Sequence, residues 1–369
     1  MNLVSNTRAT MPKLSILIPD GESPFALHVL ACLARIRSLK VHLISTKAFP
    51  LTRFSRMKHS FHVLKKGESV LDGVAEVRKK SHIDLCMPVD TDGIYYFAQH
   101  RESASALVKL SLIESVQTFR TVWDKGSLAD FLLNNQLPHP HTITSREQFE
   151  KECPSLQFPV LIKPRLAGGG SGIEKFADRI ALLKKIGAEP LFFEHYIVQQ
   201  YVQGEDIDCS VLCKDGKILA YTIQKGLYAN NSSGSFQAPS AIEFLHHPEV
   251  LQVTSQLMAR LVWNGVAHVD LRRQDTDGRI VVIEVNPRFW GSLEGSLQAG
   301  VNFAQLAIQA GLGETFPLPE YADTRYSSAL SAIKRKLQNK PAVDFFRETN
   351  LSYYFKDPLP VLARLAGVD

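Results

Sequence analysis

The sequence predicts an N-terminal α/β domain built on a parallel sheet, followed by an α+β region. Two observations lead to this prediction. Strand and helix patterns alternate through roughly the first 110 residues, as in parallel sheets whose faces are covered by helices. From about Trp123 the pattern changes to helices, a strand that precedes a glycine-rich loop, and two β-hairpins. The length of 369 residues suits two or three domains.

The N-terminal elements follow from the spacing of apolar residues. Residues 13–19 form an apolar run typical of a buried strand, residues 25–37 have helical spacing, and residues 41–44 are typical of a second strand. A helix over 70–80 then leads into a strand over 83–88.

Two turns follow strands in this region, Asp20-Gly21 and Asp90-Thr91-Asp92-Gly93. They lie where open α/β sheets usually bind ligands, although ordinary strand-ending turns explain them equally well. No GxGxxG motif follows the first strand, which argues against a dinucleotide site.

The later elements are expected between Trp123 and Gly313, and the residues after Gly313 are expected to form a short appendage. Residues 227–239 are rich in Gly, Ser and Asn, which predicts a mobile loop. The expected order is helices over 127–135 and 145–151, a strand over 158–164, a helix over 179–186, a strand over 192–201, a hairpin of 206–213 with 218–225, a helix over 248–263, a hairpin of 267–273 with 279–285, and a helix over 299–312.

Composition limits the classes of function. The net charge of +5 is small and the Lys and Arg residues are scattered, so the basic stripe of a nucleic-acid-binding protein is missing. The five cysteines include no CxxC pair, which argues against a disulfide framework or a zinc site. Residues 1–12 do not resemble a secretory signal, and no apolar run of about 18 residues occurs. We therefore expect a soluble, cytoplasmic protein without a membrane partner.

The second hairpin carries the strongest chemical pattern. Glu284 and Asn286 share one face of their strand, and a hairpin that turns near Asp277 brings Asp270 almost opposite Glu284. Carboxylate and amide oxygens are the ligands that Mg2+ prefers. Solvated acidic residues on an exposed strand are the alternative, but Glu284 lies in a nearly unbroken apolar run, where a carboxylate without a cation is costly. The pattern therefore favours a metal site.

Two other segments are weaker signals when each is taken alone. Lys163 at a strand end precedes a loop over 167–172 whose glycines allow backbone N–H groups to approach phosphate, yet glycine-rich loops are common. Phosphate binding and an ordinary loop are therefore equally good interpretations. Residues 199–206 can offer backbone groups to a base and a carboxylate to ribose, but an ordinary β connection is the better interpretation of this segment in isolation.

Taken together and in this order, these segments resemble the ATP-grasp superfamily, within it the carboxylate-amine ligase and carbamoyl-phosphate-synthetase-like branch. The resemblance extends from about Trp123 to Gly313, and its most specific segment is Glu284-Val285-Asn286-Pro287-Arg288. It implies an α+β ATP-grasp fold of two subdomains behind the N-terminal α/β domain. The implied divisions are an N-terminal tail over 1–12, the N-terminal domain over 13–118, a small subdomain over 119–193, a large subdomain over 194–313, and the appendage over 314–369.

The resemblance also implies roles in nucleotide binding. Lys125 and Lys163 correspond to two lysines that contact phosphates, and the flap that follows contains Gly169, Gly170 and Ser171. Gln199 occupies the position of a family Glu that faces the adenine amino group, so the acceptor is kept and the charge is lost. The remaining implied nucleotide contacts are Tyr201 and Val202 at the hinge and Asp206 at the ribose.

For the reacting centre, the resemblance places the metal ligands at Asp270, Glu284 and Asn286. Arg288 corresponds to the arginine that steadies the acyl phosphate or the tetrahedral intermediate. Lys225, on the other hairpin, is placed within reach of the phosphates. The implied cofactors are ATP and Mg2+, for which Mn2+ can substitute.

The implied reaction activates a small-molecule carboxylate with ATP and passes the acyl group to an amine, releasing ADP and phosphate. A homodimer is the assembly considered. Two alternatives stay open: a phosphotransferase (kinase) on the same fold, which Arg288 disfavours, and a nucleotide-binding protein without turnover. A biotin carboxylase is not expected, because only 56 residues follow Gly313. The sequence contains no readable code for the two substrates.

Overall fold

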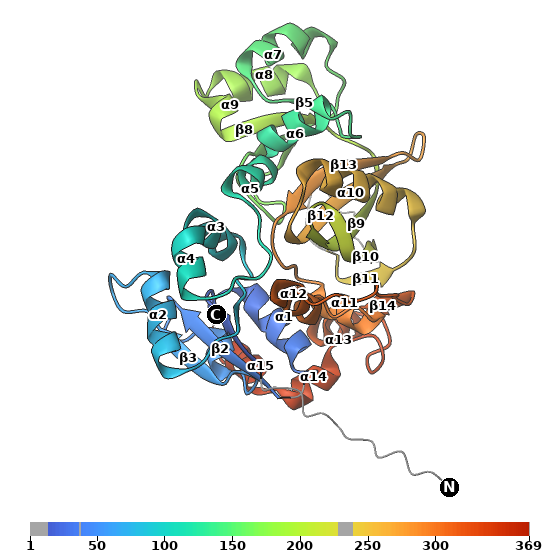
Figure 1. Cartoon of the computed structure of the whole chain (residues 1–369). Helices are drawn as coiled ribbons and strands as arrows, with labels where there is room; N and C mark the ends of the chain where they lie inside the picture. The colour runs from blue at the N-terminus through green and yellow to red at the C-terminus, as the bar shows by residue number, and fades with distance from the viewer. Residues whose placement is uncertain (1–13, 37, 228–238, 369) are drawn as a thin grey trace.

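The computed structural model describes residues 14–36, 38–227 and 239–368. Three sheets follow one another along the molecule: the N-terminal sheet at one end, the smaller sheet at the other, and the larger sheet between them (Figure 1). The predicted tail over 1–12 and all but the end residues of the predicted loop over 227–239 lie outside the described residues.

The four strands of the N-terminal sheet are parallel, which confirms the predicted α/β class. Their order is β3-β2-β1-β4, so the first strand of the chain is central. Helix α2 shows how local sequence defines an element, because Ser69 and Asp72 form a capping box at its start and three basic residues occupy its last turn. The elements are β1 (Leu14–Ile18), α1 (Pro24–Leu33), β2 (Leu39–Ser45), η1 (Leu51–Phe54), β3 (Ser60–Val63), α2 (Val70–Lys80), β4 (Leu85–Cys86), α3 (Thr91–Gln99), α4 (Arg101–Leu107) and α5 (Val116–Trp123).

The smaller sheet is antiparallel, with the order β5-β8-β6-β7. The strand predicted over 192–201 is shorter, because Phe192–His195 forms a helical turn. Adjacent side chains of a strand point to opposite faces, whereas this turn allows Phe192 and Phe193 to pack into one apolar cluster. The elements are α6 (Lys125–Asn134), β5 (Thr142–Ile143), α7 (Arg146–Glu152), η2 (Cys153–Ser155), β6 (Val160–Pro164), β7 (Glu174–Phe176), α8 (Arg179–Gly187), α9 (Phe192–His195) and β8 (Tyr196–Gln200).

Strand β8 pairs with β5 and β6. It therefore lies in the smaller sheet, although the division expected at residue 193 assigns it to the large subdomain. The connection from Tyr201 to Gln203 joins the smaller sheet to the larger one.

The larger sheet has the order β13-β12-β9-β10-β11-β14, and every pairing in it is antiparallel. Both predicted hairpins are present, as β9 with β10 and β12 with β13. Helix α10 ends at Leu261, two residues earlier than expected, because Val262 adopts a left-handed conformation with φ of 51°. The elements are β9 (Gly204–Lys214), β10 (Lys217–Leu227), β11 (Ala241–Phe244), α10 (Pro248–Leu261), β12 (Gly265–Gln274), β13 (Ile280–Asn286) and β14 (Thr324–Tyr326).

The C-terminal region packs against both other parts of the molecule. The helix predicted over 299–312 is divided at Gly300, whose φ is 125°. Strand β14 extends the larger sheet, and buried Asp357 accepts a hydrogen bond from Ser55 Oγ at 2.5 Å, which connects this region to the N-terminal domain. The helices are α11 (Leu293–Ala299), α12 (Phe303–Leu312), α13 (Ala329–Leu337), α14 (Leu351–Lys356) and α15 (Leu359–Leu365).

Two apolar clusters hold the larger sheet in place. One face packs against α10 through Leu257 and Met258. Part of the opposite face packs against the N-terminal domain through a cluster that contains Leu30, Trp290 and Phe303. Burial of this apolar surface fixes the position of the N-terminal sheet relative to the exit of β13. No helix in the described part of the chain combines the length and the apolar character that a membrane crossing requires.

Candidate active site

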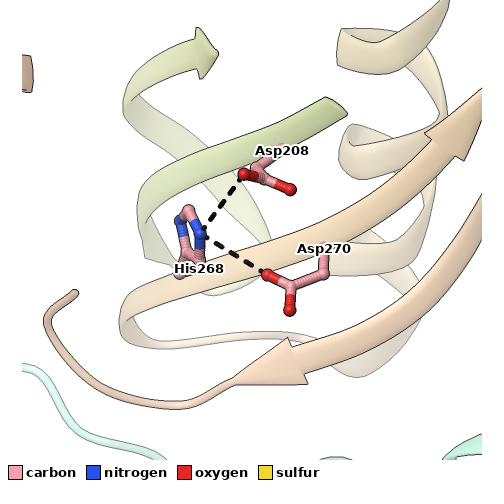
Figure 2. Close-up of side chains that lie close together, drawn as sticks. All are labelled: Asp208, His268 and Asp270. Carbon is pink, nitrogen blue, oxygen red and sulfur yellow. Dashed lines mark ion pairs between the residues drawn. The ribbon is translucent and has the colours of Figure 1, made fainter. Parts of the chain in front are cut away.

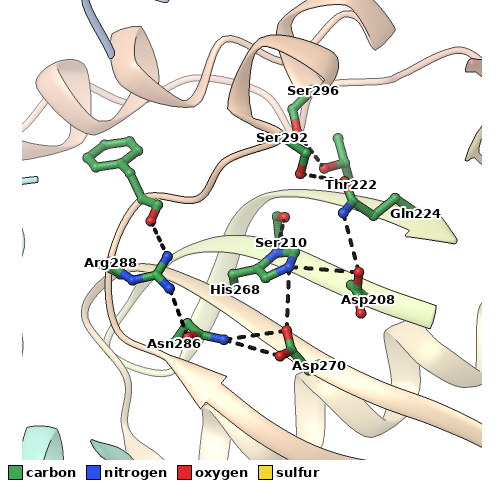
Figure 3. A network of polar contacts seen from close by, with 11 residues as sticks. Asp208, Ser210, Thr222, Gln224, His268, Asp270, Asn286, Arg288, Ser292 and Ser296 are labelled. Atoms are coloured by element: carbon green, nitrogen blue, oxygen red, sulfur yellow. Dashed lines mark hydrogen bonds and ion pairs between the residues drawn. The ribbon is translucent and has the colours of Figure 1, made fainter. Parts of the chain in front are cut away.

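Two rows of polar side chains cross the larger sheet on one face. Residues that lie directly opposite each other in neighbouring antiparallel strands point to the same face, so each row brings its members side by side. Figure 3 shows most of these side chains projecting from strands β9, β10, β12 and β13. The first row is Gln224, Asp208, Asp270 and Glu284, and the second is Thr222, Ser210, His268 and Asn286.

The opposite face of β9 explains why these residues are arranged in rows. Asp206, Asp208 and Ser210 alternate with Ile207, Cys209 and Val211, which belong to the apolar cluster beneath α10. The strand thus follows the two-residue period of a half-buried strand, and its polar residues must share the other face.

A β-bulge allows the same arrangement on β13. Asp270 pairs with Glu284 while Leu271 pairs with Val282, so Ile283 is an extra residue on β13. Without the bulge, Val282 and Glu284 would share a face. With it, Val282 and Val285 both reach the apolar cluster while Glu284 lies opposite Asp270. The bulge explains how the Glu284 carboxylate can face a polar site although its neighbours in the sequence are apolar.

Asp270, Glu284 and Asn286, the predicted metal ligands, lie together. The Asn286 amide nitrogen is 3.3 Å from Asp270 Oδ2, and the Glu284 carboxylate lies 3.2 Å from the ammonium nitrogen of Lys125. Burial, together with the negative charges of Asp208 and Glu284, raises the pKa of Asp270 well above its usual range. The row thus gathers carboxylate oxygens in a buried place, where a cation would stabilise their charged form.

Lys125 and Lys163 reach this site from the smaller sheet. Lys125 opens α6, is buried, and also donates to the backbone oxygen of Ala167 at the start of the glycine-rich loop. Lys163 lies on β6, and burial lowers its pKa to about 8 while the Glu284 charge opposes that shift. The two ammonium groups are thus placed on the side of Glu284 that faces the smaller sheet.

The predicted flap lies between β6 and β7. Gly169 and Gly170 have φ of 64° and 75°, which only glycine adopts without strain, and Ser171 is exposed. A Cβ atom at Gly169 would meet no atom within 4 Å, apart from those of its two neighbours in the chain. Its backbone is therefore open to an approaching ligand.

The residues predicted to contact adenine and ribose lie where the two sheets meet. The Gln199 side chain is buried, and its amide nitrogen donates to Thr142 Oγ1 at 3.0 Å. Val202 is half-buried in the connection between β8 and β9. Asp206 accepts a hydrogen bond from Arg272 at 2.7 Å. The carboxylate of Asp206 thus has a cationic partner before any ribose is present.

The ring of Tyr201 contacts two cationic side chains. The Lys175 ammonium nitrogen, from strand β7, lies 3.6 Å from the ring centroid, and the Arg272 guanidinium lies at 5.5 Å. These contacts join the flap strand to the hinge and to the larger sheet.

Arg288 follows β13 at the junction with the N-terminal domain. Its guanidinium donates to Asn286 Oδ1 at 3.1 Å and to the backbone oxygen of Phe289 at 2.8 Å. It also lies 4.2 Å from the ring centroid of Phe25, on α1. Arg288 is thereby fixed beside the predicted metal ligands.

The structure does not bring Lys225 to this face. Lys225 pairs with Ile207, which points into the apolar cluster, whereas its neighbour Gln224 belongs to the polar row. The Lys225 ammonium lies 3.5 Å from Glu205 and 3.7 Å from Glu243. Lys225 thus points away from the polar row, because side chains alternate along β10, and its reach to the phosphates stays a prediction.

Two further residues of the site were missed from the sequence, Asp208 and His268. Figure 2 shows them beside Asp270, and one ligand atom from each of the three lies within 4.8 Å of the others. His268 Nε2 is 3.4 Å from Asp270 and 3.8 Å from Asp208, while Nδ1 is 2.9 Å from Ser210. Burial lowers the pKa of His268 to about 3, so the imidazole is neutral. The sequence does contain a signal for these two residues, because polar residues occupy every second position of two otherwise apolar strands.

Comparisons with known proteins agree with this architecture. Residues 122–292 match the model of the ATP-grasp domain family. The carbamoyl phosphate synthase large chain of Corynebacterium glutamicum is 26% identical over 203 residues, a match that covers 52% of this chain and 18% of that protein. The chain spans about a fifth of the length of the curated relatives it matches.

Solved structures share the fold. The N5-carboxyaminoimidazole synthetase of Staphylococcus aureus has a TM-score of 0.66 at 13% identity and matches 89% of this chain and 86% of its own. An L-amino acid ligase from Bacillus licheniformis has a TM-score of 0.57 at 21% identity, over 81% of this chain and 73% of its own. At these identities the likeness shows the fold alone, an N-terminal parallel sheet followed by the two antiparallel sheets of an ATP-grasp protein.

Proposed function

We propose that this chain, which belongs to the ATP-grasp superfamily, is an ATP-dependent ligase that converts a carboxylate into an acyl phosphate and transfers the acyl group to an amine. One observation carries the proposal. Asp270 and Glu284 lie opposite each other, with Asn286 on the same face and with Lys125 and Arg288 in contact with members of this group. Oxygen ligands, an ammonium group and a guanidinium are thus gathered where phosphoryl transfer needs them.

The donor set fits magnesium. Asp270 and Glu284 would hold the ion through carboxylate oxygens, and Asn286 would contribute its amide oxygen after rotation of the amide, whose nitrogen now faces Asp270. When bound, Mg2+ neutralises phosphate charge and aligns the terminal phosphoryl group for transfer. The raised pKa of Asp270 is consistent with this assignment, because burial, and after it the charges of Asp208 and Glu284, disfavours the ionised carboxylate, which a bound cation would stabilise.

The side chains of this protein have separate roles in the first half of the reaction. The ammonium groups of Lys125 and Lys163 bind the phosphates and offset their charge. An oxygen of the substrate carboxylate attacks the γ-phosphorus as the bond to ADP breaks, which leaves an acyl phosphate. The guanidinium of Arg288 holds two oxygens of this intermediate.

The second half of the reaction needs no protein nucleophile. The amine attacks the acyl carbon, and phosphate leaves with the oxygen that came from the carboxylate. The amine nitrogen loses a proton, so the products are an amide, ADP and phosphate. Both substrates are small molecules in this proposal, and a cytoplasmic location fits a reaction that consumes ATP.

Hydroxylamine trapping tests the proposal. The protein is incubated with Mg-ATP, hydroxylamine and pools of amino acids, sugar acids and other small carboxylates, and hydroxamate is measured beside ADP. We expect hydroxamate and ADP in equal amounts with at least one acid. Phosphorylation of an alcohol without any hydroxamate would favour a kinase instead.

A further inference from the structure

The N-terminal domain contacts the end of the active-site hairpin directly. The backbone N–H of Phe289 donates to the backbone oxygen of Val89 at 3.2 Å, which joins the residue after Arg288 to the residue before Asp90. The Phe25 ring lies beneath the Arg288 guanidinium. The turn after β4, which the sequence marked as a potential ligand site, is therefore placed next to the residue proposed to hold the acyl group.

Asp90 is held in one orientation at this junction. Its Oδ2 accepts from Ser23 Oγ at 2.7 Å, and its Oδ1 accepts from the N–H of Thr91 at 2.7 Å as the N-cap of α3. Behind it, buried Asp20 accepts from the N–H groups of Asp90 and Val89 at 2.7 and 2.9 Å. These contacts leave each Asp90 oxygen with room for another hydrogen bond, because a carboxylate oxygen accepts two.

Asp90 and Arg288 carry opposite charges and lie at the same junction between the N-terminal domain and the end of β13, but they form no ion pair with each other. In the described part of the chain, Arg288 forms no ion pair within 4.0 Å. A cation and an anion separated in this way match a ligand that carries both charges itself.

We propose that the acid substrate is a zwitterion, an amino acid whose carboxylate lies at Arg288 and whose ammonium is bound by Asp90. This inference rests on the proposed function, because it takes Arg288 as the group beside the reacting carboxylate. Ser23 orients the Asp90 carboxylate, and the Phe25 ring lies against the Arg288 guanidinium. A bicarbonate-sized acid would leave the Asp90 charge without a partner.

Two other acids at the site are worse candidates for the ammonium. Asp20 is only 8% exposed, and its carboxylate already accepts a hydrogen bond from the backbone of the turn after β4. Asp208 lies on β9, two residues from Asp206, and Asp270 separates it from Glu284 in the row. Its carboxylate already accepts a hydrogen bond from Gln224 at 3.3 Å. Asp90 is half-buried, and the residue before it accepts a hydrogen bond from the N–H of Phe289, so it is the better candidate.

Paired substrates test the proposal. Hydroxamate formation is measured with alanine against propionate, leucine against isocaproate, phenylalanine against hydrocinnamate, and bicarbonate alone. We expect at least one amino acid to react with a KM at least about tenfold below that of its analogue without the amino group, the size of one lost charge-assisted contact. Equal KM values within every pair, with hydroxamate formed, would reject the zwitterion and keep the ligase. Hydroxamate from no acid would overturn both proposals.

The variant Asp90→Asn isolates the charge. Asn caps helices as well as Asp does, so α3 and the fold are expected to persist, which a thermal melt checks. The KM for the amino acid should rise about tenfold or more, while the KM for ATP stays within about twofold. Asp92→Asn is the matched control, because Asp92 lies in the first turn of the same helix and is exposed. An unchanged KM in Asp90→Asn, or the same selective increase in Asp208→Asn instead, would overturn the assignment.

Discussion

Asp270 and Glu284 lie directly opposite each other across the β12–β13 hairpin, and the bulge at Ile283 is what places them there. The pairing extends through Asp208 on β9 to Gln224 on β10, so a single row of side chains crosses four strands. Each carboxylate of the row is backed by an apolar cluster on the other face of the sheet. The proposed metal and phosphate chemistry depends on that row.

Glu284→Gln should abolish Mg2+-dependent turnover while the fold survives. The change removes one carboxylate from the proposed metal ligands and leaves its shape, so the expected loss in kcat is on the order of a thousandfold or more. The matched control is Glu243→Gln, on β11, whose carboxylate faces Lys225 away from the row. Near-parental turnover in a folded Glu284→Gln protein would remove this residue from the metal site.

Arg288→Lys should separate catalysis from nucleotide binding. A guanidinium holds two oxygens at once, which an ammonium cannot do, so kcat for amide formation should fall roughly a hundredfold. Calorimetry should find the Kd for Mg-ATP within a few fold of the parent. Equal losses of affinity and turnover would instead make Arg288 a nucleotide ligand.

Lys163 and Lys225 should behave differently on replacement by Met. Lys163 is buried on the site face, and Lys163→Met should lower kcat by roughly a hundredfold, as expected for loss of a charge that stabilises the transition state. Lys225 lies with Glu205 and Glu243, and Lys225→Met removes only partly exposed ion pairs worth about 0–1 kcal/mol. Steady-state rates with saturating Mg-ATP distinguish the two. A large loss in Lys225→Met would return that residue to the catalytic set.

Asp20 should make stability depend on pH. Burial raises the pKa of Asp20 to about 7, so the folded state favours its protonated form. The contribution of protonated Asp20 to the free energy of unfolding is fully present below the pKa that this carboxyl has in the unfolded chain. It is lost as the pH rises through about 7. Asp20→Asn keeps an acceptor and cannot ionise. Its Tm should therefore rise relative to the parent by about 1–3 °C, the size expected for roughly 1–2 kcal/mol in a chain of this length, between pH 4.5 and pH 8. A difference in Tm that stays constant over this range would contradict the assignment.

The sequence predicted the parts of the fold that follow from short-range patterns. Alternation of strand and helix identified the parallel sheet, and the turn at Asp277-Gly278 identified the hairpin that pairs Asp270 with Glu284. These features depend on side-chain period and turn chemistry, which are local. The position of Arg288 beside Asn286 followed from the same strand, because the two residues are separated by one proline.

Other features depend on contacts between distant segments, which a single sequence does not contain. The face of Lys225 is set by its register with Ile207, and the place of β8 is set by pairing with β6. Asp208 joins the row only because β9 lies between β10 and β12. The approach of Asp90 to Arg288 likewise requires the packing of two domains. Pairing and packing of this kind had to come from the structure.

Following the oxygen of the acid shows whether an acyl phosphate forms. An amino acid substrate found by hydroxamate formation is labelled with oxygen-18 in its carboxylate and converted to the amide with Mg-ATP and an amine, and the phosphate released is analysed by mass spectrometry. One labelled oxygen should appear in each phosphate, because the carboxylate oxygen that attacks the γ-phosphorus leaves with it. Phosphate without the label, released together with amide, would contradict the acyl phosphate and the role assigned to the row of Asp270 and Glu284.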